Sequence, residues 1–340
     1  MKRICAAFTA LSAFGLLLTG CGIQTQANVP KPLVVSGASN PPSPSLFHPK
    51  NRGWTFVWGD EFNAPTIDRS KWEPEISCWG GGNNERQCYT DRPENIRIED
   101  GVMKLIARPE RFSGPEMPQG FEDRGKTLTR DYTSGKIRTR EKASWKYGRI
   151  SARIKLPKGQ STWPAFWMMP ANDKYGGWPL SGEIDIMEAV NLGTSCKSCG
   201  VETAQIHTSG ALHFGRLWPD NEFITKKRPL ENLAAIDQFH EFALEWGEGQ
   251  FSWFVDGDKF FSAKQGDWFT PSVSAKKNSN APFDQSFYIM LNLAVGGEYP
   301  DKNNEKKFNP TSFPGELLVD WVRVYQCVDD LETGRSCLQE

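Results

Sequence analysis

The sequence has little net charge and no long basic run. Its 340 residues carry 40 Lys and Arg against 41 Asp and Glu, so the formal net charge is −1. A protein that binds the phosphates of a nucleic acid needs a basic face, and we therefore expect no nucleic-acid partner. Internal repeats and convincing long amphipathic helices are also missing, so the fold has to come from other elements.

No apolar run is long enough for a comfortable membrane span. Residues 4–18 are mostly apolar, follow the basic start Met1-Lys2-Arg3 and end in Leu18-Thr19-Gly20-Cys21, which resembles the bacterial lipobox. Cleavage would remove residues 1–20 as a lipoprotein signal peptide and leave Cys21 to carry lipid. An ordinary secretory signal with a chance cysteine is the alternative. Lipid on Cys21 would anchor the protein to a membrane.

This N-terminal segment predicts that the protein is anchored by lipid in the bacterial cell envelope or is secreted. The outer membrane is favoured because Gly22, and not Asp, follows Cys21. Residues 21–52 are rich in Pro, Ser and Asn, so we expect a flexible tether there. From Trp54 onward the composition is globular, and we predict one domain over residues 53–338 and a monomeric protein.

Export would place the cysteines in an oxidising compartment. Of the eight cysteines, Cys5 leaves with the signal and Cys21 carries lipid. Proximity in the sequence suggests that the remaining six form the disulfides Cys78–Cys88, Cys196–Cys199 and Cys327–Cys337. A redox or zinc site is the alternative for Cys196-Lys-Ser-Cys199, but a redox motif belongs near a βαβ pattern, which the chain lacks, and zinc would need two more ligands nearby.

Hydrophobic residues in the domain recur mostly with a period of two, which is typical of strands. Residues 95–99 and 102–107 flank Asp100-Gly101, and this pattern predicts a hairpin. Further strands are expected at residues 147–156, 241–246, 250–255, 286–293 and 317–325. Many short strands between Gly, Pro and Asn turns favour an all-β sandwich or jelly roll.

The segment Gly182-Glu-Ile-Asp-Ile-Met-Glu-Ala-Val190 places three carboxylates within six residues. On a helix, Glu183 and Glu188 would point about 140° apart and share no face. On a strand, Glu183 and Asp185 point to the same face. A β-bulge near Met187 would bring Glu188 back to that face.

Acids on a solvated strand face and a Ca²⁺ site are the alternatives for this segment. Crowded like charges destabilise a strand, and Ca²⁺ loops alternate acids with Gly and Asn rather than with Ile and Met. Two carboxyl groups about 5–5.5 Å apart perform retaining glycoside hydrolysis. Their charges push the pKa values apart, so that one stays protonated near neutral pH. We expect no catalytic cofactor.

Glu183-Ile-Asp-Ile-Met-Glu188 resembles the active-site signature of glycoside hydrolase family sixteen, in its laminarinase-like branch. Further segments match in order: Gly82-Asn-Asn-Glu85, Tyr89-Thr-Asp91, Trp163-Pro-Ala-Phe-Trp-Met-Met-Pro170, Leu212-His-Phe-Gly215, Glu245-Trp-Gly247 and Leu291-Asn-Leu-Ala-Val-Gly-Gly297. The resemblance implies a jelly roll of two curved antiparallel sheets with an open concave cleft. It also implies endo-acting hydrolysis of β-1,3-glucan.

Mixed-linkage β-1,3-1,4-glucan and agar or carrageenan galactans are the alternative substrates. A noncatalytic glucan-binding protein and a structural envelope lipoprotein are the alternatives from other classes. Residues 78–88, 196–199 and 111–132 form loops that depart from the common pattern, and such loops set the fine specificity of a site. The retained acids favour the enzyme.

Carried over residue by residue, the resemblance makes Glu183 the nucleophile, Asp185 its electrostatic partner and Glu188 the acid/base. Trp163 and Trp178 would stack on sugar rings, with core packing as the alternative. The implied polar contacts to sugar hydroxyls are Asn84, Arg138, His213 and Asn292. A structural Ca²⁺ on the convex side would be held by the backbone carbonyls of Glu61 and Gly101 and by the carboxylate of Asp320.

Overall fold

The structure is a computed structural model that describes residues 53–338. The predicted signal peptide (1–20), the lipid-bearing Cys21 and the tether (21–52) lie outside the described residues. In the described range, none of the helices has the length and the apolar character that a membrane span requires.

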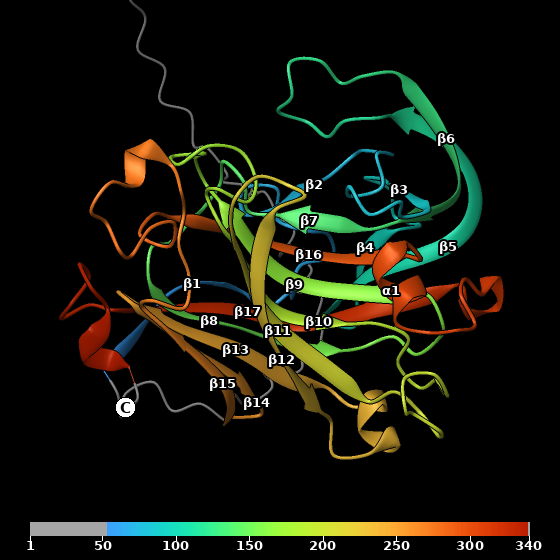
Figure 1. The fold of residues 1–340 in the computed structure, drawn as a ribbon. Coiled ribbons are helices and arrows are strands. Elements are labelled where there is room, and N and C mark those ends of the chain that lie inside the picture. The colour runs from blue at the N-terminus through green and yellow to red at the C-terminus, as the bar shows by residue number, and fades with distance from the viewer. Residues whose placement is uncertain (1–52, 339–340) are drawn as a thin grey trace, which may run out of the picture. The chain divides into compact units, whose positions relative to one another are not determined.

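Two β-sheets form the framework of the described residues (Figure 1). The ten-stranded sheet has the order β15 (Asp258–Lys264), β14 (Gln250–Val255), β13 (His240–Gly247), β8 (Gly148–Lys155), β17 (Gly315–Cys327), β5 (Val102–Pro115), β6 (Thr127–Ser134) and β3 (Gln87–Tyr89), with β1 (Trp54–Asp60) on β17 and β4 (Ile96–Glu99) on β5. The seven-stranded sheet has the order β12 (Asn221–Pro229), β11 (His207–Gly215), β10 (Glu183–Ala189), β9 (Thr162–Pro170), β16 (Phe287–Val295), β7 (Lys136–Arg138) and β2 (Glu73–Pro74).

The predicted sandwich of two sheets is confirmed, and so are the predicted strands. The hairpin around Asp100-Gly101 is the pair β4 and β5, with Glu99 opposite Val102. All strand pairs are antiparallel except β3 with β6. The described residues contain one α-helix, α1 (Glu298–Lys302), and the short 3₁₀ segments η2 (Leu233–Asp237), η3 (Val273–Ala275), η4 (Pro310–Ser312) and η5 (Arg335–Cys337).

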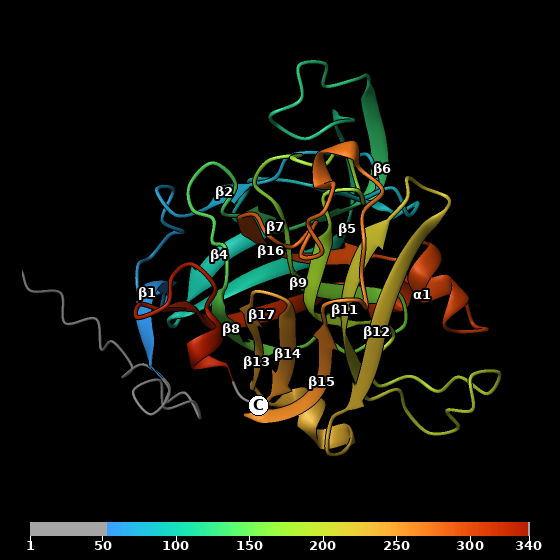
Figure 2. The ribbon, with the colours of Figure 1, turned by 60° about the vertical axis from the view of Figure 1, so that its left-hand side comes forward.

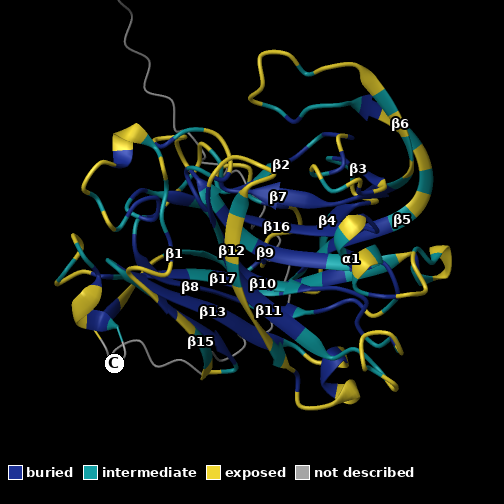
Figure 3. Ribbon diagram, viewed as in Figure 1, coloured by how far each residue is buried: buried dark blue, intermediate teal, exposed yellow. Residues whose placement is uncertain are grey.

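The core lies between the inner faces of the two sheets, where buried residues dominate both layers (Figure 3). Tryptophan supplies much of its volume, since Trp72, Trp246, Trp253 and Trp268 are all buried in this core. Strands from both sheets contribute to one cluster, because alternate residues on each strand point inward. Five of the 13 tryptophans thus fill this core.

The prediction of a polar loop over residues 111–132 is wrong in part. β5 continues to Pro115 and β6 begins at Thr127, so the two strands extend well beyond the sheet as a paired ribbon (Figures 1 and 2). Residues 116–126 close the ribbon and lie against the β2 segment, where Gln119 Nε2 donates to Pro74 O at 2.8 Å. The segment reads as polar because exposed and half-buried residues alternate along the ribbon.

The three expected disulfides are confirmed. Cys78 pairs with Cys88, Cys196 with Cys199 and Cys327 with Cys337. The first lies beside β3, the second closes a turn after β10, and the third joins the end of β17 to η5. Each therefore fastens a local loop to the framework of strands.

Candidate active site

The β-bulge predicted near Met187 is present in β10. On the β11 side, Asp185 pairs with Ala211 and Glu188 with Ser209, and the register shifts between them. On the β9 side, the shift lies between Asp185 and Met187. Ile186 and Met187 are consecutive, yet both are buried in the core between the sheets. Two successive inward residues return Glu188 to the face that Glu183 and Asp185 occupy, which we call the catalytic face.

The bulge is also held from the other sheet. The indole Nε1 of Trp253, on β14, donates to the backbone oxygen of Asp185 at 2.8 Å across the core. Gly210 on β11 makes room for this contact, because a Cβ at that position would lie 2.4 Å from Cδ1 of Trp253. The backbone of Asp185, the middle one of the three acids, is therefore held by the buried Trp253 side chain, which lies 68 residues away in the sequence.

Two indoles bind the two glutamates on the catalytic face. Trp178 Nε1 donates to Glu183 Oε2 at 2.6 Å, and Trp163 Nε1 donates to Glu188 Oε1 at 3.0 Å. Trp178 is 37% exposed and Trp163 is half-buried. Both rings thus lie beside the acids, and each anchors one carboxylate, a role that the sequence did not reveal.

His213 lies opposite Glu183 on β11 and contacts two of the acids. Its Nε2 is 3.2 Å from Asp185 Oδ2 and 3.9 Å from Glu183 Oε1. Burial acts against the charged imidazole, but the nearby carboxylates outweigh it and raise the pKa of His213 to about 10. The imidazole is therefore cationic at neutral pH and compensates part of the acidic charge.

The three carboxyl groups hold protons more tightly than ordinary acids do. Burial, together with the charge of Asp185, raises the pKa of Glu188 to about 7. Burial and the charge of Glu183 raise the pKa of Asp185 to about 6, and burial also raises the pKa of Glu183. One face thus offers a carboxyl group that stays protonated near neutrality beside others that ionise, which is the arrangement needed for combined acid and nucleophilic chemistry.

The same face also contains a set with the chemistry of metal ligands. One ligand atom each from Glu183, Asp185 and His213 lies within 4.8 Å of the others. The raised pKa of His213 means that this imidazole is protonated and supplies the positive charge itself. A protonated imidazole has no free lone pair for a metal, so a metal would have to displace this proton before His213 could bind it.

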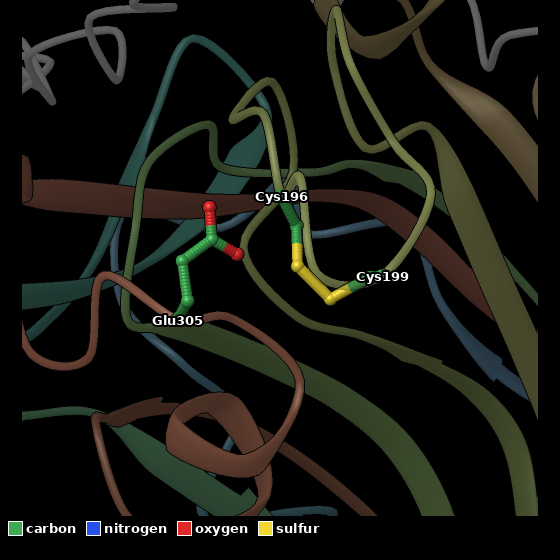
Figure 4. Close-up of side chains that lie close together, drawn as sticks. All are labelled: Cys196, Cys199 and Glu305. Atoms are coloured by element: carbon green, nitrogen blue, oxygen red, sulfur yellow. A yellow bond between two sulfur atoms is a disulfide. The ribbon is translucent and has the colours of Figure 1, made fainter.

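A second set of this kind in residues 53–338 is Cys196, Cys199 and Glu305. Figure 4 shows the two sulfur atoms joined to each other, so neither is a thiolate ligand. Glu305 instead accepts hydrogen bonds from Lys197 N at 3.0 Å and Ser198 Oγ at 2.9 Å. The carboxylate therefore fastens the disulfide turn to the loop that follows α1.

Arg138 lies opposite Met290 of β16, on the face that Trp167 occupies, but its side chain is buried with partners of its own, and a contact to a sugar stays a prediction. Its side chain is 3% exposed and is bound by Glu73 at 2.7 Å and Glu75 at 3.3 Å. Gln119 O accepts from its Nη2 at 3.0 Å. The guanidinium joins β7 to the β2 segment and the ribbon loop, because a buried cation requires such partners.

Asn292 and Asn84 lie at the margin of the catalytic face with partners of their own. Asn292 is buried, accepts from Trp167 Nε1 at 2.7 Å and donates to the Tyr89 hydroxyl at 3.1 Å. Asn84 is exposed, and its Nδ2 donates to Glu298 Oε1 at 2.8 Å. Asn292 therefore supports Trp167, and Asn84 is the more accessible of the two for a sugar hydroxyl.

The expected calcium ligands lie near β1 and β17. Glu61 follows β1 and its carboxylate is bound by Arg323 Nε at 2.7 Å, while Asp320 Oδ2 lies 2.7 Å from Arg153 Nη1. Gly101 lies in the β4–β5 turn, close to Asn63. The set offers oxygen atoms only, as Ca²⁺ prefers, but its one expected carboxylate already has an arginine partner. Calcium there stays a prediction.

Several residues of the catalytic face were not singled out from the sequence. Trp167 follows Trp163 by four residues on β9, and the period of two along that strand was the signal that could have identified it. Tyr299 of α1 packs against Trp163 with ring centroids 5.3 Å apart. Phe223 of β12 stacks on His213. Nothing local in the sequence indicates these last two contacts.

Comparison with known proteins identifies the family of the chain. The family model described as "Beta-porphyranase A-D, GH16 domain" matches residues 54–327. The chain is 37% identical over 287 residues to a glucan endo-1,3-beta-glucosidase A1 of Niallia circulans, with 82% of this chain and 39% of that relative covered, so it spans well under half of that protein.

Two further comparisons cover nearly the whole of the other protein. A glucan endo-1,3-beta-glucosidase of Cryptopygus antarcticus is 39% identical, with 79% of this chain and 92% of the relative covered. The X-ray structure of the laminarinase from Rhodothermus marinus matches with a TM-score of 0.62 and 33% identity, covering 80% of this chain and 97% of that one. The chain therefore belongs to glycoside hydrolase family 16 and is a glycoside hydrolase.

Proposed function

We propose that the enzyme hydrolyses β-1,3-linked glucan within the chain and with retention, using Glu183 as nucleophile and Glu188 as acid/base. The observation that carries this proposal is the bulge in β10, which places both glutamates on one face, each bound by an indole. The names of the two relatives support β-1,3-glucan as the substrate.

In the first step, the ionised carboxylate of Glu183 attacks the anomeric carbon of the sugar bound beside it. Glu188 donates its proton to the glycosidic oxygen, so that the bond to the leaving sugar breaks and a glycosyl ester of Glu183 forms. The pKa of Glu188, raised to about 7 by burial and by the charge of Asp185, keeps that proton available near neutrality.

In the second step, the ionised Glu188 takes a proton from water, and the water oxygen attacks the anomeric carbon. The ester bond breaks and Glu183 leaves as a carboxylate. The cationic His213 and the Trp178 indole stabilise negative charge at Glu183. Asp185 lies between the glutamates and holds His213 at 3.2 Å, so it orients the positive charge.

A galactan is the second candidate substrate, because the matching family model carries the name of a β-porphyranase. The catalytic steps would be the same, since they do not depend on the configuration of the remote hydroxyl groups. Incubation of the purified protein with laminarin, lichenan, agarose and porphyran, followed by assay of reducing ends, decides between them. Release from laminarin supports the proposal, and release from the galactans alone would replace it.

The mode of cleavage follows from the products formed in the first minutes. We propose endo action, so a mixture of oligosaccharides is expected early, together with a rapid loss of polymer length. A single small product that accumulates while the polymer stays long would show exo action. The same assay tests a noncatalytic role, because a protein that only binds glucan produces no reducing ends from any of the four polymers.

We also keep calcium and the lipid anchor as proposals. Oxygen atoms of Glu61, Gly101 and Asp320 would bind Ca²⁺, and the arginine partner of Asp320 would weaken that binding. CaCl₂ added after EGTA treatment should then raise the melting temperature modestly, and only above millimolar concentration, as in weak protein sites. An unchanged melting temperature would contradict calcium binding at these residues.

A further inference from the structure

A row of side chains leads from the nucleophile to the edge of the seven-stranded sheet. The register places Glu183 opposite His213 and His213 opposite Phe223, across β10, β11 and β12. Directly opposed residues of antiparallel strands point to the same face. Phe223 therefore projects from the catalytic face, while its neighbour Ile224 packs against the core.

Phe223 presents an exposed ring that continues the aromatic surface of the active site. It is 58% exposed. Its ring stacks on His213 with centroids 5.4 Å apart and planes 28° apart, and the Trp178 ring lies 6.2 Å from the same imidazole. The rings of Trp178, His213 and Phe223 thus form a spatial row from the indole that binds Glu183 to the edge strand β12.

We propose that Phe223 forms a further sugar-binding subsite, on which a pyranose ring of the polysaccharide stacks at a distance from the bond that is cut. Neighbouring strands lie about 4.8 Å apart, so Phe223 sits about 10 Å across the sheet from the strand of Glu183. This distance reaches beyond the sugar that Glu183 attacks. The inference rests on the proposed polysaccharide hydrolysis and adds a position to it.

The position of Phe223 on an edge strand supports a binding role. Edge strands are commonly protected by charged residues, and Glu222, Lys226 and Lys227 of β12 fit that pattern. Phe223 stands apart from other exposed hydrophobic side chains because its ring stacks on His213, which contacts two of the acids. The apolar C–H face of a pyranose fits a flat ring, and its hydroxyl groups stay in contact with water and with the polar neighbours.

The test compares Phe223→Ala with Phe56→Ala as a matched control. Phe56 is 53% exposed and lies on β1 of the ten-stranded sheet. The control substitution therefore removes an aromatic ring of similar exposure from the other sheet. The polymer used is the one that the wild-type enzyme depolymerises. We expect Phe223→Ala to lower kcat/KM on the polymer about fivefold, equivalent to about 1 kcal/mol, and to lower it far less on the shortest oligosaccharide cleaved. Phe56→Ala should match wild type on both.

Binding provides a second readout. In a Glu188→Gln background, Phe223→Ala should weaken retention of the protein in a native gel cast with the polymer, and Phe223→Trp should restore it. Equal losses on long and short substrates, with a shifted pH profile, would mean that Phe223 only supports His213, and would overturn the subsite. Unchanged kcat/KM on the polymer would overturn it too. If no polymer is cleaved by wild type, the proposed function fails instead.

Discussion

At the scale of single residues, the acids of β10 work through partners that differ in chemistry. Glu183 has an indole and a cationic imidazole beside it, whereas Glu188 has an indole, and burial together with the charge of Asp185 raises its pKa. The more strongly compensated carboxyl group is the better nucleophile, and the less compensated one keeps its proton. The environment, and not the residue type, therefore separates the two proposed roles.

Removal of either glutamate separates these roles experimentally. We expect Glu183→Gln and Glu188→Gln each to reduce polysaccharide hydrolysis by at least about 10³-fold while the circular dichroism spectrum stays that of wild type. With Glu188→Ala, azide should restore part of the activity and give a β-glycosyl azide, because retention passes through an ester of Glu183. An α-azide would indicate inversion, and near-normal turnover of either glutamine variant would remove that residue from the mechanism.

The pH dependence of kcat/KM follows from the raised pKa values. Glu188 acts as an acid and must be protonated, so the rate should fall as the pH rises through about 7. Glu183 must be ionised, and its raised pKa places the acidic limb above that of an ordinary glutamate. Measurement of kcat/KM from acid to alkaline pH tests both limbs. An alkaline limb near the ordinary glutamate pKa would contradict the assignment of Glu188.

At the scale of elements, the bulge of β10 is the feature on which the site depends. Its sequence signal was strong, because three acids with apolar residues between them can share a strand face only with one extra residue. What holds it in place was not visible in the sequence. The Trp253 indole reaches it from the other sheet, and Gly210 leaves the space.

We expect Trp253→Phe to lower kcat by roughly tenfold with a small change in KM, because the Asp185 carbonyl loses its buried donor and an unmet buried acceptor costs about 1–3 kcal/mol. Trp246→Phe is the matched control. Trp246 is equally buried, and its Nε1 has no hydrogen-bond partner among the described residues.

Both variants should therefore lose some thermal stability, but only Trp253→Phe should also shift the alkaline limb of the pH profile. Equal effects of the two substitutions on kcat would show that Trp253 contributes packing alone. Gly210→Ala gives an independent check, because its methyl group would displace the Trp253 ring and should reproduce the loss of kcat.

At the scale of the whole molecule, the two sheets contribute different parts of the site. The ten-stranded sheet supplies core volume and the Trp253 support, and the seven-stranded sheet supplies the acids, Trp163 and His213. Trp178 lies between β9 and β10, and the ribbon of β5 and β6 and the disulfide turn at Cys196 add loops to this frame. The three acids, Trp163 and His213 thus lie on strands, which hold a side chain in place more precisely than loops do.

The N-terminal prediction also belongs to this scale. Expression with the chain's own residues 1–20 in a diderm bacterium should place the protein in the membrane fraction, because lipid on Cys21 adds apolar surface that partitions into a bilayer. Cys21→Ser should release the protein or block its processing, with hydrolytic activity per molecule unchanged. Mass spectrometry that finds an unmodified mature N-terminus at another residue would refute the anchor.

The sequence by itself determined the features that depend on neighbours along the chain. Alternation predicted the strands, the order of acids and apolar residues predicted the bulge, and short separations suggested the three disulfide pairs. Only the tertiary structure decided which strands lie side by side. It placed Arg138 in a buried ion-pair group, Trp253 behind the catalytic strand and Phe223 on His213. These contacts join distant segments, and local periodicity carries no information on such pairings.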